Sequence, residues 1–202
     1  MPAKLISIIG PPAVGKTTLA EDLAADLSAG LIREDYAGNP FLAESYVGVD
    51  SARLPSQLHF LISRVGQLAR AGWPEDGLFV SDYGFCQDRA YASVRLGTED
   101  YAAYDAVATR LEPLVQPPDA IVLMEASIPA LKKRIAARGR DFERAMGPEF
   151  LAAMAGMYHG MVPQLPCAVL RVNTETVDLR QPGPRREFIR TLADRMGGLQ
   201  CA

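Results

Sequence analysis

The chain has 202 residues, of which 49% are hydrophobic and 22% are charged, and its formal net charge is −3. This length supports one domain with a single core. The weakly acidic balance excludes a broad basic surface for nucleic acid or anionic lipid. No run of about 18 uncharged apolar residues occurs, so no membrane-spanning helix is expected. The widely spaced Cys86, Cys167 and Cys201 lack metal-ligand spacing and favour a reduced, cytoplasmic protein.

Short β-branched runs alternate with helical patterns along the chain. Strands are predicted at 4–10, 31–34, 78–82, 120–125 and 168–173. Helices are predicted at 16–29, about 52–71, 99–114, 129–137, 148–162 and 185–196. Apolar strands separated by helices are typical of a parallel sheet that is covered on both faces. We therefore expect an α/β fold in which residues 1–202 form one domain.

The turn after the first predicted strand reads GPPAVGKTT. Its glycines and the pair Lys16–Thr17 fit the spacing of a phosphate-binding loop, and a strand before it and a helix after it supply the required context. In such a loop Lys16 reaches the β- and γ-phosphates, while the Thr17 hydroxyl binds Mg²⁺. The predicted nucleotide-binding residues of this loop are Gly10, Pro11, Pro12, Ala13, Val14, Gly15, Lys16, Thr17 and Thr18.

Asp82 ends the third predicted strand. In proteins with a phosphate-binding loop, a carboxylate at such a strand end helps to hold the metal. A turn or helix-capping aspartate is the alternative interpretation. The sequence thus predicts a magnesium site built by Thr17 and Asp82.

The polar residues farther along the chain occur in an order that resembles the deoxynucleoside kinases, and among them the bacterial deoxyadenosine/deoxyguanosine kinase type of the P-loop kinase superfamily. The resemblance extends from residue 4 to about 179 and depends on Glu34, Asn39, Tyr46, Gln57, Arg64, Asp82, Asp88, Arg134, Arg138, Arg140 and Glu143. It implies a three-layer P-loop fold with a five-stranded parallel sheet. It also implies an arginine-rich lid at about 134–147.

The resemblance further implies a reaction. The γ-phosphoryl group of ATP, or of another nucleoside triphosphate, would pass to the 5′-hydroxyl of a deoxynucleoside with Mg²⁺ present. Glu34 would be the general base, since a carboxylate must accept the hydroxyl proton. Tyr46 and Glu143 would hold the 3′-hydroxyl of the sugar. The positions that match the base-reading residues are Gln57, Arg64 and Asp88, which suit a purine.

Three arginines match the lid of the family. Arg134 and Arg138 would bind ATP, and Arg138 with Arg140 would stabilise the charge of the migrating phosphoryl group. Relatives form homodimers through long helices, so the helices predicted at 52–71 and 99–114 are the candidate dimer interface.

The sequence departs from the family pattern at two places. Tyr83 and Gly84 stand where the family has arginine and serine, so one cation near the reaction centre is missing. Either Arg33 or Arg89 would replace it, or the site works with fewer charges and more slowly. Asp35 stands where relatives commonly have proline, which loosens the turn after Glu34.

Two other functions stay open at this point. The spacing between Asp82 and Tyr91 also resembles the thymidylate kinases, although the missing arginine favours an acceptor without a phosphate. A non-catalytic nucleotide-binding protein is the second alternative, but an altered Glu34 or a lid without arginines would be expected there. The sequence has no Asn-Lys-x-Asp motif, which argues against a GTPase.

Overall fold

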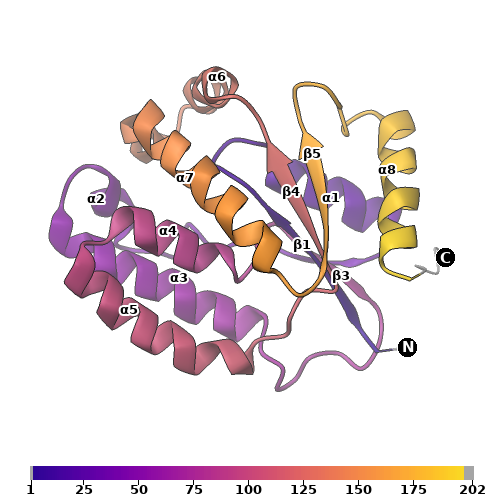
Figure 1. Cartoon of the computed structure of the whole chain (residues 1–202), viewed down its shortest axis with the longest axis horizontal. Coiled ribbons are helices and arrows are strands. Elements are labelled where there is room, and N and C mark those ends of the chain that lie inside the picture. Colours follow the sequence, from indigo (N-terminus) through magenta and orange to yellow (C-terminus); the bar gives the residue numbers. More distant parts are fainter. Residues whose placement is uncertain (1, 198–202) are drawn as a thin grey trace.

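A five-stranded sheet runs through the part of the chain that the computed structural model describes, residues 2–197 (Figure 1). The strands are β1 (Lys4–Ile9), β2 (Gly30–Ile32), β3 (Leu78–Ser81), β4 (Ala120–Glu125) and β5 (Ala168–Asn173). Their spatial order is β2-β3-β1-β4-β5, and all neighbouring pairs are parallel. The predicted five-stranded parallel sheet is therefore confirmed.

Helices connect the strands. The α-helices are α1 (Lys16–Asp26), α2 (Leu42–Tyr46), α3 (Arg53–Gln67), α4 (Gln87–Arg95), α5 (Thr98–Leu111), α6 (Ile128–Arg138), α7 (Pro148–Met161) and α8 (Pro182–Arg195). Short 3₁₀ turns lie at η1 (Asp50–Ala52), η2 (Glu112–Leu114), η3 (Asp141–Ala145) and η4 (Val162–Gln164).

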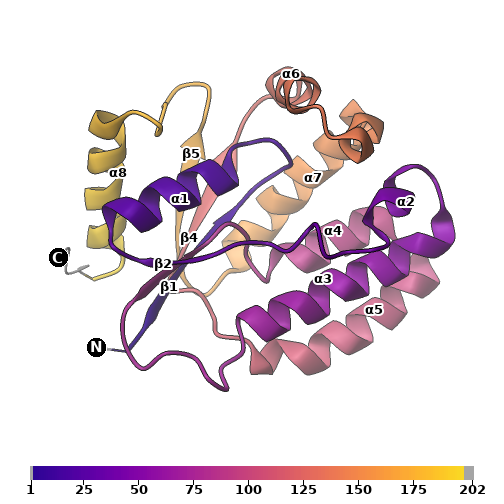
Figure 2. The same ribbon diagram turned by 180° about the vertical axis from the view of Figure 1, so that it is seen from behind.

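The helices form a layer on each face of the sheet (Figures 1 and 2). Leu23 of α1 and Ile189 of α8 belong to the core on one face, together with Val122 of β4. Met154 of α7 belongs to the core on the opposite face, together with Leu123. Adjacent residues of β4 thus face opposite layers, as the two-residue period of a strand requires. The central strands β1 and β4 are buried on both faces and read as apolar, and the partly exposed edge strands β2 and β5 keep short apolar runs, so the sequence pattern located all five.

The second strand is shorter than predicted. It ends at Ile32, so Glu34 lies two residues beyond it rather than at its end. The cause is the position of β2 at the edge of the sheet, where it pairs with β3 alone and its last partner is Ser81. The next backbone N–H groups then find other acceptors, and that of Glu34 donates to the Asp82 carboxylate.

Two helices were not predicted, α2 and α4. The first has five residues, which is little more than one turn. The second buries Gln87, Asp88 and Arg95 besides its alanines. Because its inner face is polar, it lacks the apolar stripe by which an amphipathic helix is found in a sequence.

No helix within residues 2–197 is long and apolar enough to cross a membrane. Cys86 and Cys167 are free thiols, and burial raises the pKa of Cys86 to about 12, so it stays protonated. The third cysteine, Cys201, lies outside the described residues.

Candidate active site

The phosphate-binding loop joins β1 to α1 and has the backbone that its glycines predict. Gly10 has a φ of +144°, and a Cβ atom there would lie 2.5 Å from the carbonyl oxygen of Met124 on β4. Gly15 has a φ of +108°, at the position just before α1. Residues that carry a side chain rarely adopt such backbone dihedrals. Buried Tyr158 of α7 supports the loop from below, since its hydroxyl donates to the Gly10 carbonyl at 3.0 Å.

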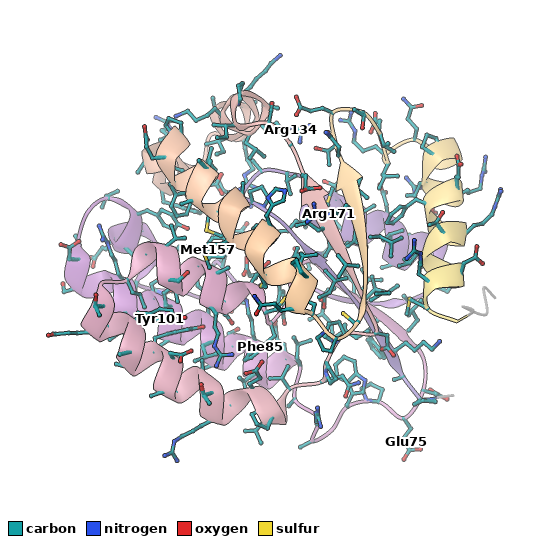
Figure 3. All side chains as sticks on the ribbon, in the orientation of Figure 1. Glu75, Phe85, Tyr101, Arg134, Met157 and Arg171 are labelled. Carbon is teal, nitrogen blue, oxygen red and sulfur yellow. The ribbon has the colours of Figure 1, made fainter. Side chains whose placement is uncertain are left out.

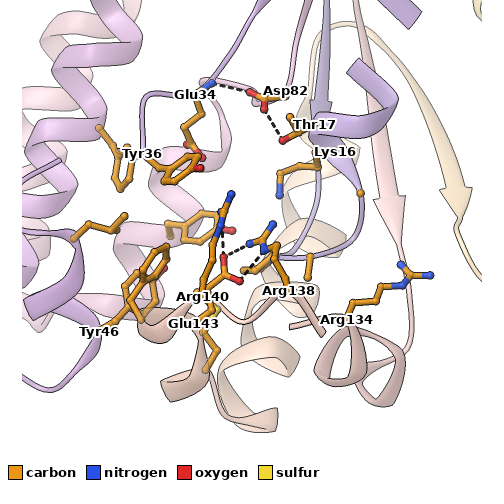
Figure 4. A pocket seen from close by; sticks show the side chains of 18 of the residues that line it. Lys16, Thr17, Glu34, Tyr36, Tyr46, Asp82, Arg134, Arg138, Arg140 and Glu143 are labelled. Carbon is orange, nitrogen blue, oxygen red and sulfur yellow. Dashed lines mark hydrogen bonds and ion pairs between the residues drawn. The ribbon is translucent and has the colours of Figure 1, made fainter. Parts of the chain in front are cut away.

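The Lys16 ammonium group folds over this loop and points into the cavity that the loop borders (Figure 4). It donates to the carbonyl oxygens of Gly10 at 2.9 Å and Pro11 at 3.1 Å. Burial lowers the pKa of Lys16 to about 8, although the charge of Asp82 opposes the shift. An anionic phosphate group at this position would favour the charged form.

Asp82 lies between the phosphate loop and the segment that carries Glu34. One carboxylate oxygen accepts the Thr17 hydroxyl at 2.7 Å, and the other accepts the Glu34 backbone N–H at 2.8 Å (Figure 4). Burial raises the pKa of Asp82, while the Thr17 hydroxyl and the Lys16 charge act to lower it. One carboxylate therefore aligns the predicted donor site with the predicted base.

The predicted residues converge on one cavity of about 320 Å³ at the carboxyl ends of β1 and β3. This is the edge at which parallel α/β sheets bind ligands. Its lining includes the predicted acceptor and catalytic residues Lys16, Glu34, Tyr46, Gln57, Arg64 and Glu143. Asp88 is the exception, because it is 1% exposed and lies behind Arg64, with which it pairs.

Gln57 offers a free amide to this cavity. The residue is 2% exposed on α3, and within residues 2–197 its side chain has no hydrogen-bond partner. A buried amide normally has partners, and it supplies both donors and acceptors. The arrangement leaves those groups for a ligand with a polar edge.

Tyr46 lies at the far end of the cavity from the phosphate loop, among aromatic rings. Its ring centroid is 5.7 Å from that of Phe142, and the Arg95 guanidinium carbon lies 3.8 Å above it. Burial raises the pKa of Tyr46, so its hydroxyl stays protonated and remains a donor. Arg95 itself is 8% exposed and donates to the carbonyl and hydroxyl oxygens of Ser45.

Arg138 and Arg140, two of the arginines predicted to form a lid, both point toward Glu143 (Figure 4). Arg138 donates to Glu143 through two nitrogens, and Arg140 lies 3.4 Å from the same carboxylate. Arg140 also lies over the ring of Tyr36, 4.1 Å from its centroid. Glu143, 3% exposed, thus holds two cations at the edge of the cavity opposite Lys16.

Arg134 takes a different direction (Figures 3 and 4). It extends from α6 to the loop after β5, where it donates to the Thr174 hydroxyl at 2.8 Å and the Thr174 carbonyl at 3.3 Å. A second cavity of about 280 Å³ lies beside it, between the phosphate loop and Leu179. Of the three arginines predicted to form the lid, Arg134 is therefore the one that borders both cavities.

Neither suggested substitute for the missing family arginine reaches the cavity. Arg33 pairs with Glu21 at the surface, and Arg89 of α4 pairs with Asp105 and Glu112 of the α5–η2 segment. Tyr83 is fully buried, and its hydroxyl donates to Gln67 at 2.6 Å. The expectation that Arg33 or Arg89 supplies this charge is therefore wrong for the arrangement described.

Sequence reasoning missed Arg95 and Tyr158 as parts of the site. Arg95 follows Asp88 by seven residues, the same spacing that placed Gln57 and Arg64 on one helix face. Recognition of α4 as a helix would have revealed it. Tyr158 belongs to the apolar face of α7, and nothing in its local sequence separates it from the core.

Comparisons with known proteins support the family resemblance. A sequence model of the family described as deoxynucleoside kinase matches residues 6–194. The deoxyguanosine kinase of Bacillus subtilis (strain 168) is 28% identical over 199 residues, which cover 95% of this chain and 92% of the relative. The deoxyadenosine/deoxycytidine kinase of the same organism is 25% identical over 183 residues, covering 87% and 84%.

The fold is shared with a solved structure of deoxyadenosine kinase from M. mycoides with the products dCMP and a flexible dCDP bound. The TM-score is 0.81 at 20% identity, and the match covers 94% of this chain and 99% of the other. Since the family model spans nearly the whole chain, and the site joins a phosphate-binding loop to a polar acceptor cavity, the protein belongs to the deoxynucleoside kinase family of ATP-dependent phosphotransferases.

Proposed function

We propose that the protein phosphorylates the 5′-hydroxyl of a purine deoxynucleoside and that Glu34 is the general base. One observation carries the proposal: Asp82 connects the Thr17 hydroxyl of the phosphate loop to the backbone of Glu34. The donor phosphates and the proton acceptor are thereby brought to the same wall of one cavity. Such an arrangement lowers a barrier chiefly by positioning and electrostatics.

The step is an in-line displacement at phosphorus. As the 5′-oxygen forms its bond to the γ-phosphorus, the bond from that phosphorus to the β–γ bridging oxygen breaks, and ADP leaves. Glu34 takes the proton of the 5′-hydroxyl. Lys16 stabilises the negative charge on the phosphoryl oxygens, and Arg138 with Arg140 approach the same group once they exchange Glu143 for phosphate.

Magnesium suits the donor site that the chain offers. Thr17 and Asp82 supply one hydroxyl and one carboxylate, and no cluster of three or more His, Cys, Asp or Glu side chains occurs within residues 2–197. Mg²⁺ prefers such sparse oxygen sites, where phosphates and water complete its shell. We propose that Thr17 and Asp82 hold the ion, which neutralises phosphate charge when it is bound.

The two ends of the acceptor cavity then bind sugar and base. Tyr46 is a protonated donor and Glu143 an acceptor, which matches a 3′-hydroxyl. The unpartnered amide of Gln57 and the guanidinium of Arg64 face the base. Among relatives, deoxyguanosine, deoxyadenosine and deoxyadenosine/deoxycytidine kinases, as they are named, support a purine as the preferred base.

The second cavity accommodates the base of the phosphate donor. It opens beside the phosphate loop and is bordered by Val14, Arg134 and Leu179. An arginine fixed by Thr174 and an apolar floor suit a planar ring, since guanidinium groups stack on such rings. We assign this cavity to the adenine of ATP.

We also propose a cytoplasmic homodimer. The free thiols of Cys86 and Cys167 suit a reducing compartment. Ile62 of α3 is 56% exposed and Val107 of α5 is 38% exposed, so both long helices carry apolar side chains on their outer faces. A second copy of the chain would cover them.

ATP affinity is expected to fall as pH rises through about 8, the pKa to which burial lowers Lys16. Below about pH 8 the Lys16 ammonium group is already charged in the ATP-free protein. Above it, binding requires uptake of a proton, and the affinity falls by up to about tenfold per pH unit. The terminal phosphate of ATP is already mostly ionised at pH 7, so its own titration contributes little to the change above that pH. Isothermal titration calorimetry from pH 7 to pH 9.5, in buffers of different ionisation enthalpy, measures the ATP affinity and the number of protons taken up on binding.

Lys16→Arg is the control for this titration, because arginine keeps its charge over the whole range. Its ATP affinity should not change between pH 7 and pH 9.5, even if it is weaker overall. An equal slope in the Lys16→Arg variant would assign the titration to another group.

The proposed function is tested with purified protein and Mg-ATP. Deoxyadenosine, deoxyguanosine, deoxycytidine, thymidine and thymidine monophosphate are supplied separately, and products are separated by chromatography. A monophosphate formed fastest from a purine deoxynucleoside is the expected result. Phosphorylation of thymidine monophosphate alone would assign the protein to the nucleoside monophosphate kinases, and ATP binding without turnover would contradict a catalytic function.

A further inference from the structure

A single guanidinium group joins the two carboxylates of the acceptor site. Arg64 donates through Nη1 to Asp88 and through Nη2 to Glu34. Within residues 2–197, Arg64 is the one cation that forms an ion pair with Glu34. The side chain that borders the predicted base position therefore also touches the predicted general base.

The surroundings hold this guanidinium in place. The Arg64 side chain is 5% exposed, and its central carbon lies 5.2 Å from the ring centroids of both Phe60 and Tyr83. Asp88, itself 2% exposed at its side chain, fixes the group from behind. A buried ion pair with stacked rings on the cation has little freedom to rotate.

Glu34 lacks comparable support of its own. It follows the three-residue edge strand β2 by two positions, and its side chain is 25% exposed. Its backbone N–H is tied to Asp82, but this bond leaves the side-chain torsions free. The Glu34 carboxylate therefore takes its direction from Arg64, which engages Oε1 and leaves Oε2 for a proton.

We propose that Arg64 is a positioning residue for Glu34 in addition to facing the acceptor base. It supplies the cation that Tyr83, Arg33 and Arg89 do not supply. The inference depends on the proposed function, in which Glu34 accepts the proton of the 5′-hydroxyl. Because one guanidinium contacts both the acceptor base and Glu34, the identity of that base affects kcat as well as KM.

The test is a set of steady-state measurements with the best deoxynucleoside and saturating Mg-ATP. The variants are Arg64→Gln, Arg64→Lys, Glu34→Gln and the double variant Glu34→Gln/Arg64→Gln. Gln57→Met is the matched comparison, since Gln57 faces the base without touching Glu34. Arg89→Gln, whose partners lie on α5 and η2 outside the cavity, is the neutral control.

Misdirection of Glu34 is expected to lower kcat by about a hundredfold in Arg64→Gln, as small displacements of reacting groups do. Arg64→Lys keeps the charge but cannot bridge two carboxylates with a planar fork, so it should recover part of kcat. Thermal melting verifies folding, and Arg64→Lys preserves the test if Arg64→Gln does not fold. Gln57→Met should raise KM and leave kcat within a few-fold of wild type.

The double variant is decisive. If Arg64 acts through Glu34, its removal costs nothing further once Glu34 is glutamine, so the double variant equals Glu34→Gln. The inference would be overturned if the kcat reductions of the two single variants multiplied in the double variant, or if the Arg64 variants raised only KM, as Gln57→Met does. Wild-type turnover would still support the proposed function in either case. Absence of wild-type turnover with every deoxynucleoside would overturn both.

Discussion

Glu34→Gln is expected to abolish most of the phosphotransferase activity, with kcat lowered by about 10²- to 10⁴-fold, the usual contribution of a general base. The amide keeps the shape of the side chain and an oxygen for Arg64, but it cannot take a proton. Binding of the deoxynucleoside should change little, because the glutamine amide can still form a hydrogen bond with the 5′-hydroxyl. Steady-state rates over a range of acceptor concentrations separate the two effects.

Asp35→Asn is the matched control, since it exchanges the adjacent carboxylate for an amide. Asp35 accepts the Gly38 backbone N–H at 2.8 Å, a bond that the asparagine oxygen can retain, and it does not line the cavity. Its kcat should stay within a few-fold of wild type. If Glu34→Gln kept more than a tenth of the wild-type kcat, another group would have to be the base.

Gly10→Ala is expected to destabilise the fold by about 3 kcal/mol or more, as substitutions with a severe backbone conflict do. The residue has a φ of +144°, and the new Cβ would lie 2.5 Å from the Met124 carbonyl oxygen and 3.2 Å from a Val14 methyl group. Backbone atoms of β4 cannot move aside as a flexible side chain can. Urea unfolding followed by circular dichroism measures the loss, and ATP binding should weaken with it.

Gly139→Ala separates the steric conflict from the backbone dihedral. Gly139 also has a positive φ, +69°, but no atom lies within 4 Å of the position its Cβ would take. Only the dihedral cost remains, about 1 kcal/mol. Equal losses in the two variants would show that the contact with β4 does not determine the stability of the phosphate loop.

The fold was predictable from the sequence because its central strands β1 and β4 are buried on both faces and its edge strands β2 and β5 still carry short apolar runs. Each of the five reads as a short apolar run, whether at the centre, as β1 is, or at an edge, as β5 is. The strand order depends on pairings between distant segments, and neither periodicity nor spacing determines it. Resemblance to the family supplied the layered architecture, and the sheet confirmed it.

The site was predictable to the extent that its residues follow strands or share a helix face. Lys16, Glu34 and Asp82 follow three parallel strands and so meet at one edge of the sheet. Gln57 and Arg64, seven residues apart, do line the same cavity. Their roles in binding and catalysis remain predictions that the variants above will test.

The pairs among the charged residues could not be predicted. Arg64 lies 30 residues from Glu34 and 24 from Asp88, and no spacing rule applies across such distances. Arg95 was missed because α4 buries the polar side chains of Gln87, Asp88 and Arg95, and so lacks a continuous apolar stripe. Where a helix borders a ligand site, hydrophobic patterning is a poor guide to its presence.

Two different kinds of structure hold the two walls of the cavity. The phosphate loop is wedged against the strands, with Gly10 beside the backbone of β4, whereas Gln57 and Arg64 project from α3, outside the sheet. Substitutions in the first wall that conflict with the backbone of β4 are expected to disrupt folding, whereas substitutions at Gln57 in the second wall are expected chiefly to change which acceptor base binds. After gene duplication, one copy can therefore change its nucleoside specificity while it retains ATP as the phosphate donor.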